Sequence, residues 1–230
     1  MFVYVSPSAE RKRQQLRQAA RCCLSMLCIA GIVGCAATGY ERLVQAAAQR
    51  QNRYDFESAE RLHWQALQEL RQASDVDEVE LARQLSNHAS ALNLLGRAAE
   101  ARAELEEALQ LLEQQPDPPA DRLYHVYANL GRSLELLGEL EQAAAYYTTS
   151  IQLGTETLGL PPDQLGFQVA GLANIYARQG RDKLAQIFYR VAKLFYRWRY
   201  GENSYWWQRR EKEFLDIRKA NEIAGRQATE

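Results

Sequence analysis

The chain has 230 residues, of which 47% are hydrophobic and 25% are charged, and its formal net charge is −1. That hydrophobic content can bury a sizeable core, which excludes disorder of the whole chain. Gly and Pro are sparse, and the abundance of Ala, Leu, Gln, Glu and Arg favours helix.

The charge is unevenly distributed along the chain. Residues 36–177 carry 10 basic and 21 acidic side chains, a net of −11, whereas residues 178–230 carry 13 basic and seven acidic, a net of +6. Such a dipole can orient a partner or a second copy, or it is an uneven solvated surface. The basic end has no dense Lys/Arg stripe, so we expect no nucleic-acid partner.

The N-terminus has the layout of an export signal. Five of the six charged side chains in residues 1–35 are basic, and an uncharged apolar stretch, residues 22–39, follows them. All four cysteines lie in this stretch, so disulfides play no part in the fold of the remaining chain. We therefore assign residues 1–39 to a signal or membrane anchor.

The segment Ile32-Val33-Gly34-Cys35 resembles the lipobox of bacterial lipoproteins. That resemblance implies cleavage before Cys35, lipidation of Cys35 and firm anchoring by its acyl chains. One alternative is an uncleaved membrane helix, for which 18 residues are at the short end of a bilayer span. The other is a buried or interfacial helix. The first two interpretations place the following residues beyond the inner membrane, in the periplasm of a Gram-negative cell.

A 42-residue repeat follows the N-terminal segment. Glycines 42 residues apart are flanked by apolar residues spaced three or four apart, which predicts pairs of amphipathic helices joined by tight turns. The co-phased sets are Gly96, Gly138 and Gly180; Ala101, Ala143 and Ala185; Leu105, Tyr147 and Tyr189; and Ala108, Ser150 and Ala192. Prolines between the units support this division. We predict four pairs, at about 40–73, 79–115, 120–157 and 163–200.

This pattern resembles the tetratricopeptide-repeat (TPR) family, and its 42-residue period resembles the kinesin-light-chain subtype. The resemblance implies an all-α, right-handed solenoid in which the first helix of each pair lines a concave face. The first unit departs from the pattern, because Tyr54 replaces the glycine and Arg50 replaces an apolar residue. It is either degenerate or a cap.

The same resemblance implies a peptide-binding groove on the concave face. Asparagine amides there can donate to and accept from a peptide backbone, and arginines can bind carboxylates. The candidate groove residues are Asn87, Ser90, Asn129, Arg132, Asn174 and Arg178. Gly171 stands where a third asparagine is expected. The alternative is that these are ordinary polar residues on a wet surface.

The C-terminal segment, 201–230, is predicted to form a capping helix and tail. Aromatic residues crowd around its start, and we identify four of them as cap or partner contacts: Trp198, Tyr205, Trp206 and Trp207. Aromatics among arginines are typical of interfaces and membrane belts. The simpler interpretation is that they pack against the end of the solenoid.

No chemistry is expected. The three histidines are isolated within predicted helices, no metal-ligand, phosphate-binding or nucleophile motif is present, and acidic runs such as residues 104–107 are interpreted as solvated faces. We therefore predict no metal, no cofactor, no small-molecule substrate and no enzymatic activity. The predicted function is a membrane-anchored adaptor that binds a protein or peptide partner and assembles an envelope complex. A permanent structural subunit is the alternative.

Overall fold

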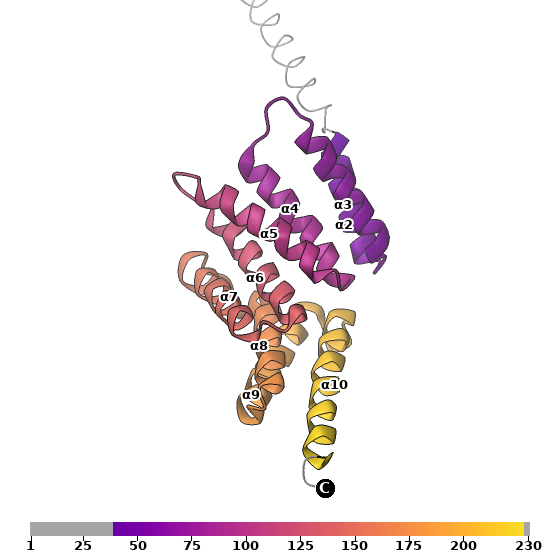
Figure 1. Cartoon of the computed structure of the whole chain (residues 1–230), viewed down its shortest axis with the longest axis vertical. Coiled ribbons are helices and arrows are strands. Elements are labelled where there is room, and N and C mark those ends of the chain that lie inside the picture. The colour runs from indigo at the N-terminus through magenta and orange to yellow at the C-terminus, as the bar shows by residue number, and fades with distance from the viewer. Residues whose placement is uncertain (1–38, 228–230) are drawn as a thin grey trace, which may run out of the picture.

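The computed structural model of the protein describes residues 39–227 (Figure 1). Within this span every regular element is helical, so the expected all-α class is confirmed. The elements are α2 (Gly39–Asn52), α3 (Phe56–Arg71), α4 (Glu78–Leu94), α5 (Ala98–Glu113), α6 (Ala120–Leu137), α7 (Leu140–Gln152), η1 (Leu153–Thr157), η2 (Pro162–Leu165), α8 (Gly166–Arg178), α9 (Asp182–Tyr200) and α10 (Tyr205–Gln227). None of the described helices combines the length and the hydropathy needed to cross a membrane.

The helices pack in consecutive pairs, and the pairs stack into a solenoid (Figure 1). The pairs are α2–α3, α4–α5, α6–α7 and α8–α9, and the second helix of each pair also packs against the first helix of the next. Buried Leu and Ala side chains from α3 to α6 form one continuous cluster, which continues through Tyr147 and Leu172 into the last pair. A pair cannot cover its apolar face alone, so stacking is what builds this core.

Glycines end the first helix of three pairs in the left-handed conformation, with φ of 79°, 83° and 70° at Gly96, Gly138 and Gly180. After each glycine the next amide donates back to the helix, as Arg97 N does to Leu92 O at 2.9 Å. Tyr54 adopts the same conformation, with φ of 62°, and Asp55 N donates to Arg50 O at 3.0 Å. The first unit therefore keeps the turn, at a steric cost of about 1 kcal/mol for the tyrosine.

The Tyr147 ring lies between the helices of two neighbouring pairs. A Cβ built on Gly131 of α6 would lie 2.7 Å from this ring, and one built on Gly171 of α8 would lie closer still. Tyr147 is fully buried. This close approach explains why the asparagine series stops at Gly171, because an asparagine side chain has no room there.

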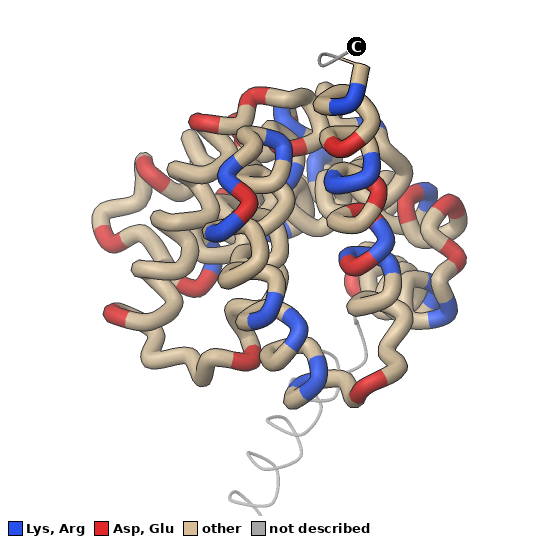
Figure 2. Tube along the Cα trace, turned by 90° about the horizontal axis from the view of Figure 1, so that it is seen from below, with Lys and Arg blue, Asp and Glu red and all other residues tan. Residues whose placement is uncertain are grey.

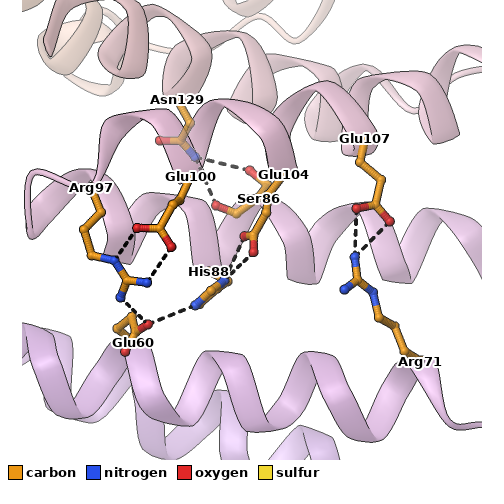
Figure 3. A network of polar contacts seen from close by, with 9 residues as sticks. All are labelled: Glu60, Arg71, Ser86, His88, Arg97, Glu100, Glu104, Glu107 and Asn129. Atoms are coloured by element: carbon orange, nitrogen blue, oxygen red, sulfur yellow. Dashed lines mark hydrogen bonds and ion pairs between the residues drawn. The ribbon is translucent and has the colours of Figure 1, made fainter. Parts of the chain in front are cut away.

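Ion pairs link neighbouring pairs along the stack (Figure 3). Arg71 of α3 binds Glu107 of α5 at 2.8 Å, and Arg97 binds Glu60 of α3 at 2.8 Å. His88 of α4 lies 2.7 Å from Glu104. The acidic run at residues 104–107 is thus partly engaged between helices, in contrast to the solvated face we expected. The partly exposed Arg71–Glu107 and Arg97–Glu60 pairs each contribute only about 0–1 kcal/mol.

The last helix takes a path that the repeat does not predict. After Gly201, α10 packs more extensively against α8 than against α9, and its N-terminal end reaches the turn between α2 and α3 (Figure 1). Basic and acidic segments alternate along it up to the C-terminal label (Figure 2). It therefore packs on the last pair, as a cap does, but it also spans the stack.

We expect Gly171→Ala to destabilise the fold by about 1–3 kcal/mol, because the added methyl group overpacks the Tyr147 site. Gly225→Ala is the control, since it lies in α10 and a methyl group added there would meet nothing within 4 Å. Helix propensity alone should make that control neutral or slightly stabilising. Urea unfolding followed by circular dichroism measures both. Equal stabilities would show that Tyr147 can move aside.

Candidate peptide-binding groove

Two connected cavities lie on the inner face formed by α4, α6 and α8. They measure about 310 and 250 Å³ and share Ser90, His125 and Asn129. We call these two cavities together the groove. Its smaller part lies between α4 and α6, and its larger part continues past Tyr124 towards Phe167 on α8. The two parts together extend along the stack from α4 to α8.

Three predicted residues come together in the groove. Asn87, Ser90 and Asn129 all line its smaller cavity. The Asn129 amide nitrogen donates to Ser86 Oγ at 3.2 Å and contacts the Ser86 carbonyl at 3.4 Å (Figure 3). The Asn87 amide donates to Gln84 Oε1 at 3.4 Å. These contacts hold the two amides on the facing helices α4 and α6.

Arg132 and Asn174 are not open to solvent as we expected. Arg132 is 8% exposed and donates to Glu213 of α10 at 2.7 Å. Asn174 is 2% exposed and donates to Glu213 at 3.4 Å. Helix α10 thus covers this part of the inner face. Arg178 is exposed at the C-terminal end of α8, away from the cavities described above.

A buried carboxylate, Glu135 of α6, lies at the centre of the covered part. It accepts hydrogen bonds from Arg132 at 3.0 Å, Tyr147 at 2.8 Å and Asn174 at 2.9 Å, and Arg210 lies 3.6 Å away. Burial acts to raise the pKa of Glu135, but the two arginines and the hydrogen bonds lower it to about 2. Glu135 is therefore ionised at neutral pH.

Glu135 was not among the residues predicted from the sequence, although a signal was present. Its 42-residue equivalents are Asn93 and Ala177, and all three positions are buried. A carboxylate at a position that is buried in both neighbouring units must find cations. From this pattern one could have predicted that a basic residue outside the repeat contacts Glu135, but not that this residue is Arg210.

The aromatic residues at the start of α10 bind other parts of the same chain. Tyr205 stacks on Tyr54 with ring centroids 4.0 Å apart, and Trp206 lies 5.9 Å from Phe56. Trp207 is buried against Tyr189 and Tyr196. Arg209 adds a hydrogen bond of 2.9 Å to the carbonyl of Leu94. The packing interpretation therefore describes Tyr205, Trp206 and Trp207, whereas Trp198 is 62% exposed on α9.

The groove offers little acid–base chemistry. Burial lowers the pKa of His125, so its imidazole is neutral at pH 7, and burial also raises the pKa of Tyr124. Outside the groove, burial lowers the pKa of His63 to about 4. In residues 39–227, no group of three or more His, Cys, Asp or Glu side chains is arranged to hold a metal ion. Recognition through hydrogen bonds and aromatic contacts is what these groups support.

The structure is that of a helical-repeat protein, in which the helix pairs share the same kind of turn and the same 42-residue register. A family model described as tetratricopeptide repeat matches residues 80–156. Residues 80–156 therefore carry the tetratricopeptide repeats that the sequence pattern predicted. Repeats of this family support a role as a protein–protein interaction scaffold.

A crystal structure of BtubC (BKLC) from P. vanneervenii has a similar fold. The TM-score is 0.56 and the sequence identity is 21%, over 93% of this chain and 82% of that chain. At this identity the similarity concerns the fold alone. A search of curated proteins found no match.

We expect Glu135→Gln to destabilise the protein by about 3–5 kcal/mol at pH 7, because it leaves the two buried charges of Arg132 and Arg210 with Glu213 alone to balance them. The folded pKa of Glu135 lies below its ordinary value of 4.5, so its contribution is complete above pH 4.5 and is lost as the pH falls towards 2. The stability difference between wild type and variant should therefore shrink over this pH range.

Urea unfolding at pH 7, 5, 4 and 3 measures this difference. The control is Glu106→Gln, which removes an exposed i,i+4 pair with Arg102 and should cost less than about 1 kcal/mol. A pH-independent penalty for Glu135→Gln would contradict the assigned ionisation.

Proposed function

We propose that this protein is a membrane-anchored adaptor that holds a peptide or helix of a partner protein in the groove and so helps to assemble an envelope complex. The alternative is a permanent structural subunit of a larger membrane complex. Both roles use the same scaffold, and they differ in whether the protein is stable alone. A subunit that aggregates when purified without its complex would favour the alternative.

The observation that carries the adaptor proposal is the binding of α10 to the inner face. This helix of the same chain is held by Arg132 and Asn174, two of the predicted groove residues, and by the Leu94 carbonyl. The inner face thus has side chains and backbone groups suited to a polypeptide. The neighbouring groove is left open and presents the same kinds of group.

The lining of the groove indicates which segments it suits. Tyr124, Phe167 and Trp206 offer aromatic surface, and Arg122 and Arg199 add positive charge that Asp121 and Asp163 partly balance. Aromatic and arginine side chains of this kind dominate binding energies at interfaces. A segment with an apolar anchor and carboxylates would therefore fit best.

The membrane part of the proposal depends on residues 1–38, which lie outside the described residues, and on Cys35 in particular. A basic run before an uncharged apolar stretch and a lipobox-like Ile32-Val33-Gly34-Cys35 support it. Under this proposal the repeats lie in the periplasm.

Anchoring is tested by the intact mass of the mature protein from the membrane fraction. A lipoprotein should begin at Cys35 and carry acyl chains, and Cys35→Ala should leave an uncleaved, unacylated precursor. An uncleaved anchor should keep residues 1–34 and be unaffected by Cys35→Ala. A full-length protein that fractionates with the cytosol would contradict both forms of anchoring.

Partner binding is tested by substituting the two facing amides together. After affinity purification from solubilised membranes and identification of the partner by mass spectrometry, its affinity is measured by titration. We expect Asn87→Ala/Asn129→Ala to weaken binding about tenfold, since each lost hydrogen bond is worth about 0.5–1.5 kcal/mol. Asn203→Ala, an exposed asparagine before α10, is the control. Unchanged affinity would exclude the groove as the partner site.

A further inference from the structure

Helix α9 exposes a row of apolar side chains on its outer side. Ile187, Val191, Leu194 and Trp198 are 55%, 36%, 41% and 62% exposed. Their spacings of four, three and four residues place them on one narrow face of the helix. We call these four residues the outer row. An exposed apolar row of this kind marks an interaction site more often than scattered single residues do.

The fold does not require apolar residues at these positions. The 42-residue register gives Arg61, Gln65, Gln68 and Gln72 in the first unit, Ala103, Glu107, Gln110 and Gln114 in the second, and Ala145, Thr149, Gln152 and Glu156 in the third. These positions are polar or alanine and lie at the surface in every case. Only the last unit of the stack replaces them with Ile, Val, Leu and Trp.

The path of α10 leaves the outer row uncovered. Phe214 and Trp207 of α10 pack against Tyr189, and Trp207 also packs against Tyr196, on the opposite side of α9 from the outer row. Tyr196 also faces the groove. The outer row and the groove are therefore on different sides of the molecule, and α9 lies at the end of the stack (Figure 1).

A row of basic side chains runs along one edge of the outer row. Lys183, Arg190 and Arg197 follow each other at intervals of seven residues and are all exposed. Across Asp182–Tyr200 there are five basic residues and one acidic residue, Asp182. Arg197 pairs with the exposed Glu202 at 2.7 Å, which is a surface contact of little strength. The face therefore favours an anionic partner.

The spacing identifies the partner as a helix. The half-buried Leu184 extends the outer row by one residue, so that the apolar residues follow each other at alternating steps of three and four. This is the spacing of a coiled-coil seam, and the basic row occupies a position that flanks it. A helix lying on a bilayer usually presents a wider apolar face than a single seam. The seam is therefore better matched by one partner helix than by a membrane surface.

Charge argues against two possible ligands of the outer row: a second copy of this protein and the protein's own N-terminal segment. A second copy paired about a two-fold axis in antiparallel fashion would bring the two basic rows face to face. Residues 1–35 carry five basic groups and one acidic group, so they would be repelled as well. We propose that the outer row binds an amphipathic helix of another protein, whose apolar seam is flanked by acidic residues. Together with the groove, this gives the scaffold two separate partner sites.

The test uses the full-length protein in detergent micelles and two designed helical peptides. Both carry Leu at the seam positions; one has Glu and the other Lys at the flanking positions. Titration is followed by peptide fluorescence anisotropy at two salt concentrations. We expect the Glu peptide to bind at least about tenfold more tightly than the Lys peptide, and added salt to reduce this preference.

Two variants test the residues themselves. The first, called the α7-like variant, gives α9 the residues that α7 and η1 carry in the same register: Ile187→Ala, Val191→Thr, Leu194→Gln and Trp198→Glu. Because the third unit folds with these residues, this variant should stay folded and lose binding of the Glu peptide. The second, Arg190→Glu/Arg197→Glu, should reverse the preference towards the Lys peptide, whereas Lys212→Glu, an exposed cation of α10, should not.

Several outcomes would overturn the inference. These are equal affinities for the two peptides, binding that survives the α7-like variant, and an unchanged preference after charge reversal. Binding to anionic vesicles, with neither peptide bound, would assign the row to a membrane. Concentration-dependent self-association that disappears in the α7-like variant would assign it to a second copy. The Asn87→Ala/Asn129→Ala variant should bind the Glu peptide normally, so failure of the groove proposal remains distinguishable.

Discussion

The placement of the last helix depends on one buried carboxylate. Glu135 is fully buried, and groups from four helices contact it: Arg132 of α6, Tyr147 of α7, Asn174 of α8 and Arg210 of α10. A buried carboxylate that lacked cations would be strongly destabilising. Arg132 and Arg210 supply two positive charges, and Glu213 of α10 balances the second. The cluster closes only when α10 lies across α8.

This placement of α10 determines which surfaces the scaffold offers. The helix covers Arg132 and Asn174, and the groove that remains open runs from Asn87 on α4 past Asn129 to Phe167 on α8. The same path takes α10 away from the outer side of α9, so the outer row stays exposed. The covered inner face, the open groove and the outer row are therefore three consequences of one packing arrangement.

The repeat predicted the helix pairs because its determinants are local. Glycines at fixed intervals terminate first helices, and small residues such as Ala143 mark where helices touch. The path of α10 could not be predicted, since the Arg132–Glu213 pair joins residues 81 apart that share no period. Of the predicted groove residues, Asn87, Ser90 and Asn129 line one cavity, whereas Asn174 is covered by α10, whose path the repeat does not encode. The binding role of all of them stays a prediction.

The energetic asymmetry of α10 limits what a groove ligand can reach. Near its middle, α10 is held by the buried ion cluster around Glu213, and in its first turn Trp207 is buried against Tyr189. By contrast, the Tyr205 and Trp206 side chains stack on Tyr54 and Phe56 at the turn between α2 and α3. Surface aromatic contacts of that kind are worth about 0.5–1.5 kcal/mol each, less than breaking a buried ion pair. The Tyr205 and Trp206 side chains are therefore the part of α10 that a ligand displaces most easily to lengthen the groove towards α2, whereas a ligand that advances onto Asn174 has to compensate Glu135. The groove can therefore be lengthened towards α2, whereas towards Asn174 it is closed by the buried charges around Glu135.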